Sequence, residues 1–489
     1  MVYPNVLQSP PESSLQRSEH GSTSQNVCSS VPNVVTLDAW NTTLSVLDPA
    51  LSPATVHTVH SPISNPSSNR TTSALQRWHG LERDLALQDP STTLERTVNH
   101  CFELFFEYLY PLTPLVHEPS LRDGLGFFVT QGRISRADGL VYGLGSLKYP
   151  ELWPDFTFTL ITAVCAEAAF LLPKDIFPEG ERIADALLQA SRNCLATYLE
   201  ADLEYPNANS VAIRYFHSNC MHAAGKPRLS WHIFGEATRL AQVMQMHEEE
   251  SLQGLTVLEA EFRRRAFWIA YIGDKSAAIL NNRPITIHKY SFESGITIGY
   301  PTGIENETIL TPGSAVPDEE GTRNSFIAGF NANIRLWQSA SDLLLEMRLL
   351  DSQKTANLLP RQPPTSEESH RIDHLYVLFA TSLDDLPPFL QYDQLMADSN
   401  KDNQRLSRLT RLHAIQATNV YVSLHCLKMV ISQKFEELNY YPPEQNEMLL
   451  LRKTDIARDL LRVIRDAPFW ALQVNGEPCV SHNPILILC

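Results

Sequence analysis

Two acidic runs, one of them opened by a histidine, are the first places where this sequence could do metal chemistry. His247 opens a His-Glu-Glu-Glu run, but it lacks the second histidine that a zinc protease helix carries one turn later. Asp384 and Asp385 could place carboxylates for magnesium on a helix, as all-helical terpene cyclases do. Pro387 and Pro388 follow after a single leucine, however, and would break the helix carrying those ligands. Neither run therefore predicts a metal-dependent active site.

Glycine-rich and nucleophile motifs are equally incomplete. Gly225-Lys226 lacks the upstream glycine of a phosphate-binding loop, and there is no G-x-S-x-G nucleophile elbow. Gly124-Leu-Gly126 lacks the third glycine of a dinucleotide loop, so we expect a turn in a connecting segment over 124–154. A helical enzyme is the least favoured hypothesis, because no cluster of catalytic residues is found.

Charged residues within apolar helical runs predict a different kind of chemistry, which is internal ion pairing. Glu261 and Arg265 are four residues apart and within reach of each other along a helix. A buried arginine needs a carboxylate partner, because an unpaired buried charge costs several kcal/mol. Arg264, Asp274 and Arg283 are close by in the sequence. We interpret these five residues as a salt-bridge frame that fixes how helices meet, with no catalytic role.

A helical hairpin over 230–274 must position this frame. Trp231, Phe234, Ala237 and their successors recur at steps of three and four residues, which places them on one helix face with Ser230 as a plausible N-cap. The second helix is apolar over so much of its circumference that we expect it to be buried. Its apolar positions are Leu258, Phe262, Ala266, Phe267, Trp268, Ile269, Tyr271 and Ile272.

This hairpin resembles the middle regulatory domain of fungal zinc-cluster transcription factors. The matching residues are Ala237, Arg239, Ala241, Glu261, Arg263, Arg264, Arg265, Phe267, Trp268, Asp274, Arg283 and Pro284. A second matching stretch, Cys101 to Leu121, opens with an aromatic run and ends in a proline-bounded turn, and the resemblance covers about 100–480. From it we assign a structural signature that holds the helices around any effector pocket: Trp231, Arg239, Glu261, Arg264, Arg265, Trp268, Asp274 and Arg283.

The resemblance implies a nuclear protein that restrains or releases transcription by RNA polymerase II, for genes of metabolism or of a biosynthetic cluster. It also implies homodimers or heterodimers with related factors, contact with the transcription machinery, and in some members a small metabolite bound between helices. Members hold zinc through a cysteine cluster in a DNA-binding head. Here the eight cysteines are scattered without a CxxC pair, so no cofactor is expected in this chain and they are typical of reduced core thiols. The net charge of −16 also opposes direct DNA binding.

The overall expectation is an all-α protein, a large helical array with a disordered N-terminal segment and long loops. Residues 1–75 are rich in Ser, Thr, Asn and Pro and predict a disordered linker. We expect the regulatory core over 76–300, a loop over 301–325 and the C-terminal helical part of the regulatory domain over 326–489. The apolar run 156–172 is short for a membrane span and predicts a buried helix.

An interaction protein of a second class stays open beside the regulator. Such a protein would sense a signal or dimerise with a complete relative and titrate it, without contacting DNA. The absence of a DNA-reading element within the sequence favours it, and a mobility-shift assay would separate the two. The apolar ending at 481–489 departs from the family pattern, so we expect both ends of the chain to differ from the usual arrangement.

Overall fold

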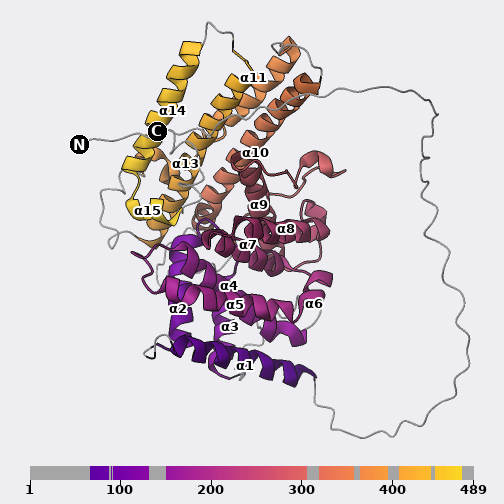
Figure 1. Ribbon diagram of the computed structural model, residues 1–489, viewed down its shortest axis with the longest axis vertical. Helices are drawn as coiled ribbons and strands as arrows, with labels where there is room; N and C mark the ends of the chain where they lie inside the picture. The colour runs from indigo at the N-terminus through magenta and orange to yellow at the C-terminus, as the bar shows by residue number, and fades with distance from the viewer. Residues whose placement is uncertain are drawn as a thin grey trace, which may run out of the picture. The chain divides into compact units, whose positions relative to one another are not determined.

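The computed structural model describes residues 66–87, 90, 92–131, 150–304, 319–356, 364–394, 407–441 and 446–475. Within these ranges every regular element is a helix, which confirms the all-α prediction (Figure 1). The described residues belong to one compact unit that begins at Ile63. Most of residues 1–75, predicted to be disordered, lie outside the described ranges.

Helix α4 is the centre of the first group of helices. It packs against α1, α2, α3, α5 and α7, and its residues are apolar on nearly every side, which is why it is buried on nearly every side. The span Pro150–Leu171 is long and apolar enough to cross a membrane, but 78% of its most apolar window is buried inside the protein. This group comprises α1 (Pro66–Ala86), α2 (Leu94–Leu104), the π-helix η1 (Phe105–Leu109), α3 (Glu118–Val129), α4 (Trp153–Leu171), α5 (Gly180–Ala196) and α6 (Leu199–Glu204).

Helix α3 occupies a stretch where we expected a glycine-rich turn. Pro119 stands in its first turn, where a proline costs no hydrogen bond, and the helix runs through Gly124 and Gly126. A Cβ atom at Gly124 would collide with Cγ2 of Thr157 on α4. The turn prediction at 124–126 is therefore wrong, because the glycine permits close helix packing and does not mark a chain reversal.

The predicted hairpin consists of α8 (Pro227–Val243) and α9 (Val257–Leu280), with α7 (Ala208–Ala223) packed against both. Helix α8 begins at Pro227, so Ser230 lies within its first turn and is not the N-cap that we predicted. Thr256 caps α9 by accepting a hydrogen bond from the backbone N–H of Glu259.

The C-terminal helices complete the core of the first group. Phe326 and Ile334 on α10, Ile415 on α13 and Val474 on α15 are buried in the same apolar cluster as residues of α2, α4, α7 and α9. In Figure 1, α10 and α13 run side by side, and α11 and α14 pack against them. These helices are α10 (Glu319–Ala356), α11 (Ser366–Ala380), α13 (Arg408–Glu437), α14 (Asn446–Asp466) and α15 (Phe469–Val474).

Two segment boundaries differ from the predicted ones. Helix α1 begins at Pro66, within the stretch predicted to be disordered, and α10 begins at Glu319, within the predicted loop. Part of the predicted loop, 305–318, lies outside the described residues. Before it, Pro301 and Ile304 are buried, so this part of the chain is held against the helices.

Candidate functional site

A buried ion pair between Glu261 and Arg265 lies in the middle of the molecule. The Nε of Arg265 donates to Oε1 of Glu261 over 3.0 Å, and the two side chains are 2% or less exposed. Arg265 also donates to the hydroxyl of Tyr110, and its guanidinium lies over the ring of Phe326 on α10. The pair therefore joins α9 to the residue that follows η1 and to α10, at a point that water does not reach.

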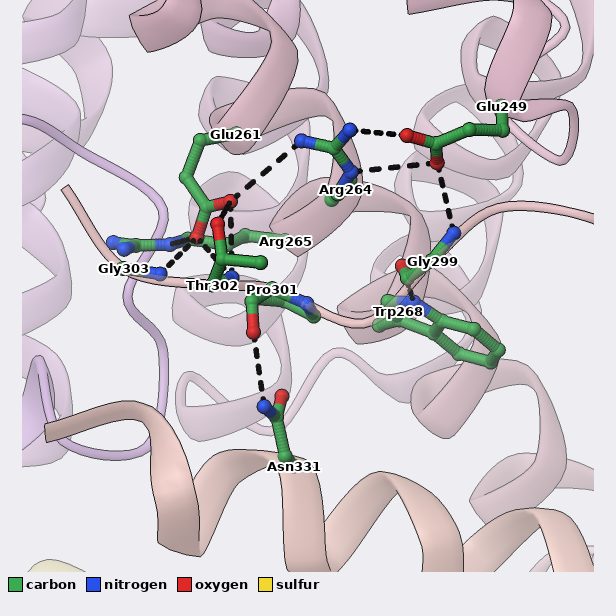
Figure 2. Close-up of polar contacts among 10 residues, drawn as sticks. All are labelled: Glu249, Glu261, Arg264, Arg265, Trp268, Gly299, Pro301, Thr302, Gly303 and Asn331. Carbon is green, nitrogen blue, oxygen red and sulfur yellow. Dashed lines mark hydrogen bonds and ion pairs between the residues drawn. The ribbon is translucent and has the colours of Figure 1, made fainter. Parts of the chain in front are cut away.

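Glu261 also fixes the backbone that follows the hairpin. Its carboxylate accepts the N–H of Thr302 at 3.2 Å and the N–H of Gly303 at 3.0 Å (Figure 2). The same segment is held on its other side, because Asn331 on α10 donates to the carbonyl of Pro301 over 2.9 Å. Trp268 adds a third attachment through its indole N–H, 2.9 Å from the carbonyl oxygen of Gly299. We call residues 299–303 with these partners the α9 clamp.

Arg264 ties the edge of the clamp to the turn between α8 and α9. It donates to the carboxylate of Glu249, which in turn accepts the backbone N–H of Gly299 over 2.9 Å (Figure 2). The hydrogen bond from Arg264 holds the pKa of Glu249 below its usual range. Glu249 thus remains charged and bridges two segments that are far apart in the sequence.

Asp274 forms a separate cluster further along α9. Its carboxylate accepts the backbone N–H groups of Thr286 at 2.8 Å and Ile287 at 3.1 Å, and its ion-pair partner is Lys275 at 3.0 Å. Lys275 also donates to the carbonyl of Ile287. Our prediction that Asp274 shares one salt-bridge frame with the arginines is wrong, because the adjacent lysine and two backbone amides fill its acceptor sites.

Arg283 does not belong to an ion-pair frame either. Its guanidinium lies 5.8 Å from the ring centroid of Trp231, and no carboxylate of the described ranges is within ion-pair distance of it. Arg239 is exposed and donates to Gln242 over 2.9 Å. Glu261, Arg264, Arg265 and Trp268 thus meet at the clamp, Trp231 and Arg283 form a cation–π pair, and Asp274 and Arg239 lie elsewhere.

Sequence reasoning missed a second buried pair, between Arg214 and Asp202. The Nη1 of Arg214 donates to Asp202 over 2.6 Å, and both side chains are 1% or less exposed. Asp202 also accepts a hydrogen bond from Ser210, so it joins α6 to α7. The partners are not at helical spacing, since a turn separates their helices, and no local pattern signals the pair.

A cavity of about 650 Å³ lies between the hairpin and the C-terminal helices. Its walls come from α4, α7, α8, α9, α10, α13 and α15. Two of the predicted signature residues, Trp231 and Arg283, line it. Its volume is within the range of about 300–1,000 Å³ that small-molecule sites occupy. The resemblance implied a pocket between helices, but most of its lining was not predicted, because its walls are assembled from helices far apart along the chain.

Glu167 is the fully buried ionisable group on the cavity wall. It accepts a hydrogen bond from Asn219 over 2.8 Å, and burial raises its pKa from 4.5 to about 8. The hydrogen bond from Asn219 opposes that shift without cancelling it. At neutral pH this side chain is therefore a neutral acid, which can both donate and accept a hydrogen bond.

Comparison with known proteins identifies the family. The fungal specific transcription factor domain matches residues 102–416, which is more than half of the chain and includes the α9 clamp. The chain belongs to this family.

Individual relatives from this family match the chain over shorter stretches. The citrinin biosynthesis transcriptional activator of Monascus ruber is 24% identical over 245 residues, or 47% of this chain and 40% of the relative. The aurofusarin cluster transcription factor of Gibberella zeae is 28% identical over 197 residues, or 37% of this chain and 25% of the relative. The chain thus matches less than half of the length of these relatives. No solved structure matches it.

The zinc that the resemblance implies has no fitting site in the described part of this family member. Those ranges hold no group of three or more His, Cys, Asp or Glu side chains placed to bind a metal ion. The cysteines within them are buried free thiols on five different helices, which is the core use predicted from the sequence. They are Cys101, Cys165, Cys194, Cys220 and Cys426. The described residues thus provide a helical scaffold without a zinc cluster.

Proposed function

We propose that this chain is the regulatory region of a fungal transcription regulator that acts in the nucleus on genes of a biosynthetic cluster. The observation that carries the proposal is the family match over 102–416, all of whose described helices belong to one folded unit. Two of the relatives above are named for the control of biosynthetic genes, which favours that class of target.

The distribution of charge supports a controlling role over direct DNA contact. The most buried arginines are neutralised within the protein, Arg265 by Glu261 and Arg214 by Asp202, so they are not available to phosphates. A net charge of −16 adds repulsion from a DNA backbone. We infer that the helical unit modulates transcription through protein partners, including a second copy or a related factor, and through an effector.

A reporter assay tests this function. The chain is fused to a heterologous DNA-binding domain and expressed in a fungal host with a reporter gene carrying the matching operator. We expect the fusion to change reporter output relative to the DNA-binding domain alone. We expect Arg265→Met to abolish the change and Arg458→Ala, which removes an exposed pair with Asp455, to preserve it.

Two results would overturn the proposal. One is unchanged reporter output when the fusion and the DNA-binding domain alone accumulate in the nucleus to equal levels. The other is unchanged expression of every biosynthetic cluster after deletion of the gene.

A further inference from the structure

Few charged side chains line the central cavity, which favours an uncharged ligand. Among the described side chains that line it there is no lysine and no aspartate. Its one arginine, Arg283, lies against the face of Trp231. Arg283 and His222 are the basic side chains of the lining, so an anionic ligand would lose its hydration at a cost of several kcal/mol and could regain only part of it from them.

Aromatic side chains supply much of the remaining wall. Trp231 and Phe234 stack with their ring centroids 5.7 Å apart on α8. Phe170 faces the cavity from α4, and Phe330 and Trp337 face it from α10. Walls of this kind favour an aromatic ligand, whose rings pack edge-to-face or offset against such side chains.

Asn475 presents a hydrogen-bond acceptor that the protein leaves unused. Its side chain is 8% exposed and lines the cavity. The Nδ2 group donates to the carbonyls of Ala471 at 2.7 Å and Ile415 at 3.4 Å, which fixes the orientation of the amide. The Oδ1 atom is buried and has no partner among the described residues. Such an acceptor costs free energy until a donor reaches it.

A second acceptor lies on α10. The Oδ1 atom of Asn333, which also lines the cavity, is buried without a partner in the described part of the chain. Hydroxyl groups on a ligand are donors of the size and polarity that would satisfy both amides. The acid form of Glu167, on a third helix of the wall, could donate to a ligand oxygen.

We propose that this cavity binds an uncharged aromatic molecule whose hydroxyl groups donate hydrogen bonds to the side chains of Asn475 and Asn333. Because the wall draws on α4, α8, α9, α10, α13 and α15, the ligand would tie the hairpin to the C-terminal helices and stabilise that arrangement. Its role as the effector rests on the proposed function, whereas binding itself does not.

Calorimetric titration of the purified full chain tests the proposal with three small probes. Naphthol carries the aromatic rings and one hydroxyl donor, its methyl ether lacks the donor, and naphthoate is an anion of similar size. We expect naphthol to bind, the ether to bind roughly two- to tenfold more weakly, and naphthoate to bind more weakly than naphthol. The ratio of the naphthol affinity to the ether affinity reflects one neutral hydrogen bond.

Three variants locate the binding site. Asn475→Leu keeps the volume and removes the acceptor, so naphthol affinity should fall roughly two- to tenfold while the ether is unaffected. Ala277→Phe places a ring in the cavity and should abolish binding of both. Asn193→Leu, at an exposed position of α5 outside the cavity, should change neither. Circular dichroism checks each fold, and Asn475→Leu decides the outcome if Ala277→Phe does not fold.

The proposal is overturned if none of the probes binds, if naphthoate binds as tightly as naphthol, or if Asn475→Leu leaves naphthol affinity unchanged. These results differ from a failure of the proposed function. If the chain binds naphthol as expected but leaves the reporter unchanged, the proposed binding site stands and the proposed role in transcription fails.

Discussion

Buried ionisable side chains around α4 and α7 follow one rule, in which a charge is kept only where an opposite charge meets it. Arg214 and Asp202 are both buried and remain a pair at 2.6 Å. His217 is hydrogen-bonded to Ser191 over 2.8 Å, and burial lowers its pKa to about 3, so it is neutral. Glu167 has amide and thiol neighbours, and burial raises its pKa to about 8.

The raised pKa of Glu167 predicts a pH-dependent stability that Glu167→Gln removes. Between pH 4.5 and about 8 the folded state binds a proton that the unfolded state has released. The contribution to stability is therefore complete below pH 4.5 and is lost as pH rises through about 8, with a slope of at most about 1.4 kcal/mol per pH unit. Glutamine is neutral throughout and keeps the hydrogen bond from Asn219.

Urea unfolding of both proteins at several pH values checks this expectation. The free energy of unfolding of the wild type should fall relative to that of Glu167→Gln as pH rises from about 6 to about 8. His217 titrates alike in both proteins, so its opposite effect below its usual pKa cancels in the difference. Parallel curves would show that Glu167 is ionised in the folded protein.

At the scale of elements, α9 fixes the two segments that follow it. Glu261, about one turn into the helix, holds the backbone at 302–303, and Asp274, nearly five turns in, holds the backbone at 286–287. The pairing of Glu261 with Arg265 could be predicted, because four residues of helix bring the two side chains together. The capture of backbone amides could not, since Thr302 lies 41 residues from Glu261 in a stretch without periodicity.

Two variants of the α9 clamp should therefore differ in their effect on residues 299–303. Both Glu261→Ala and Arg265→Met break the buried pair, and each should lower the free energy of unfolding by about 3–5 kcal/mol. Only Glu261→Ala also removes the acceptor of the amides of Thr302 and Gly303. Hydrogen exchange should speed up at those two amides in Glu261→Ala well beyond its increase in Arg265→Met. Equal exchange rates in the two variants would mean that contacts other than those with Glu261 keep residues 299–303 in place.

At the scale of the whole molecule, periodicity predicted most helices but not which of them share a core. We expected a regulatory core before the loop at 301–325 and a C-terminal helical part of the same regulatory domain after it. The apolar cluster includes residues from both sides of that loop, because Phe326, Phe330 and Ile334 are buried against residues of the first group. A hydrophobic pattern shows which face of a helix is covered but not which helix covers it. The residues that line the cavity could not be predicted from the sequence for the same reason.

The shared core predicts that the two parts cannot fold separately. Residues 1–304 expressed alone would expose the surface that these C-terminal side chains cover. At about 2 kcal/mol for each large apolar side chain, losing half a dozen contacts of this kind is comparable to a total stability of about 5–15 kcal/mol. We expect 1–304 and 305–489 each to lack a cooperative thermal transition, and their co-expression to restore one. A cooperative transition in 1–304 alone, at the temperature of the intact chain, would mean that the apolar cluster is not a single core.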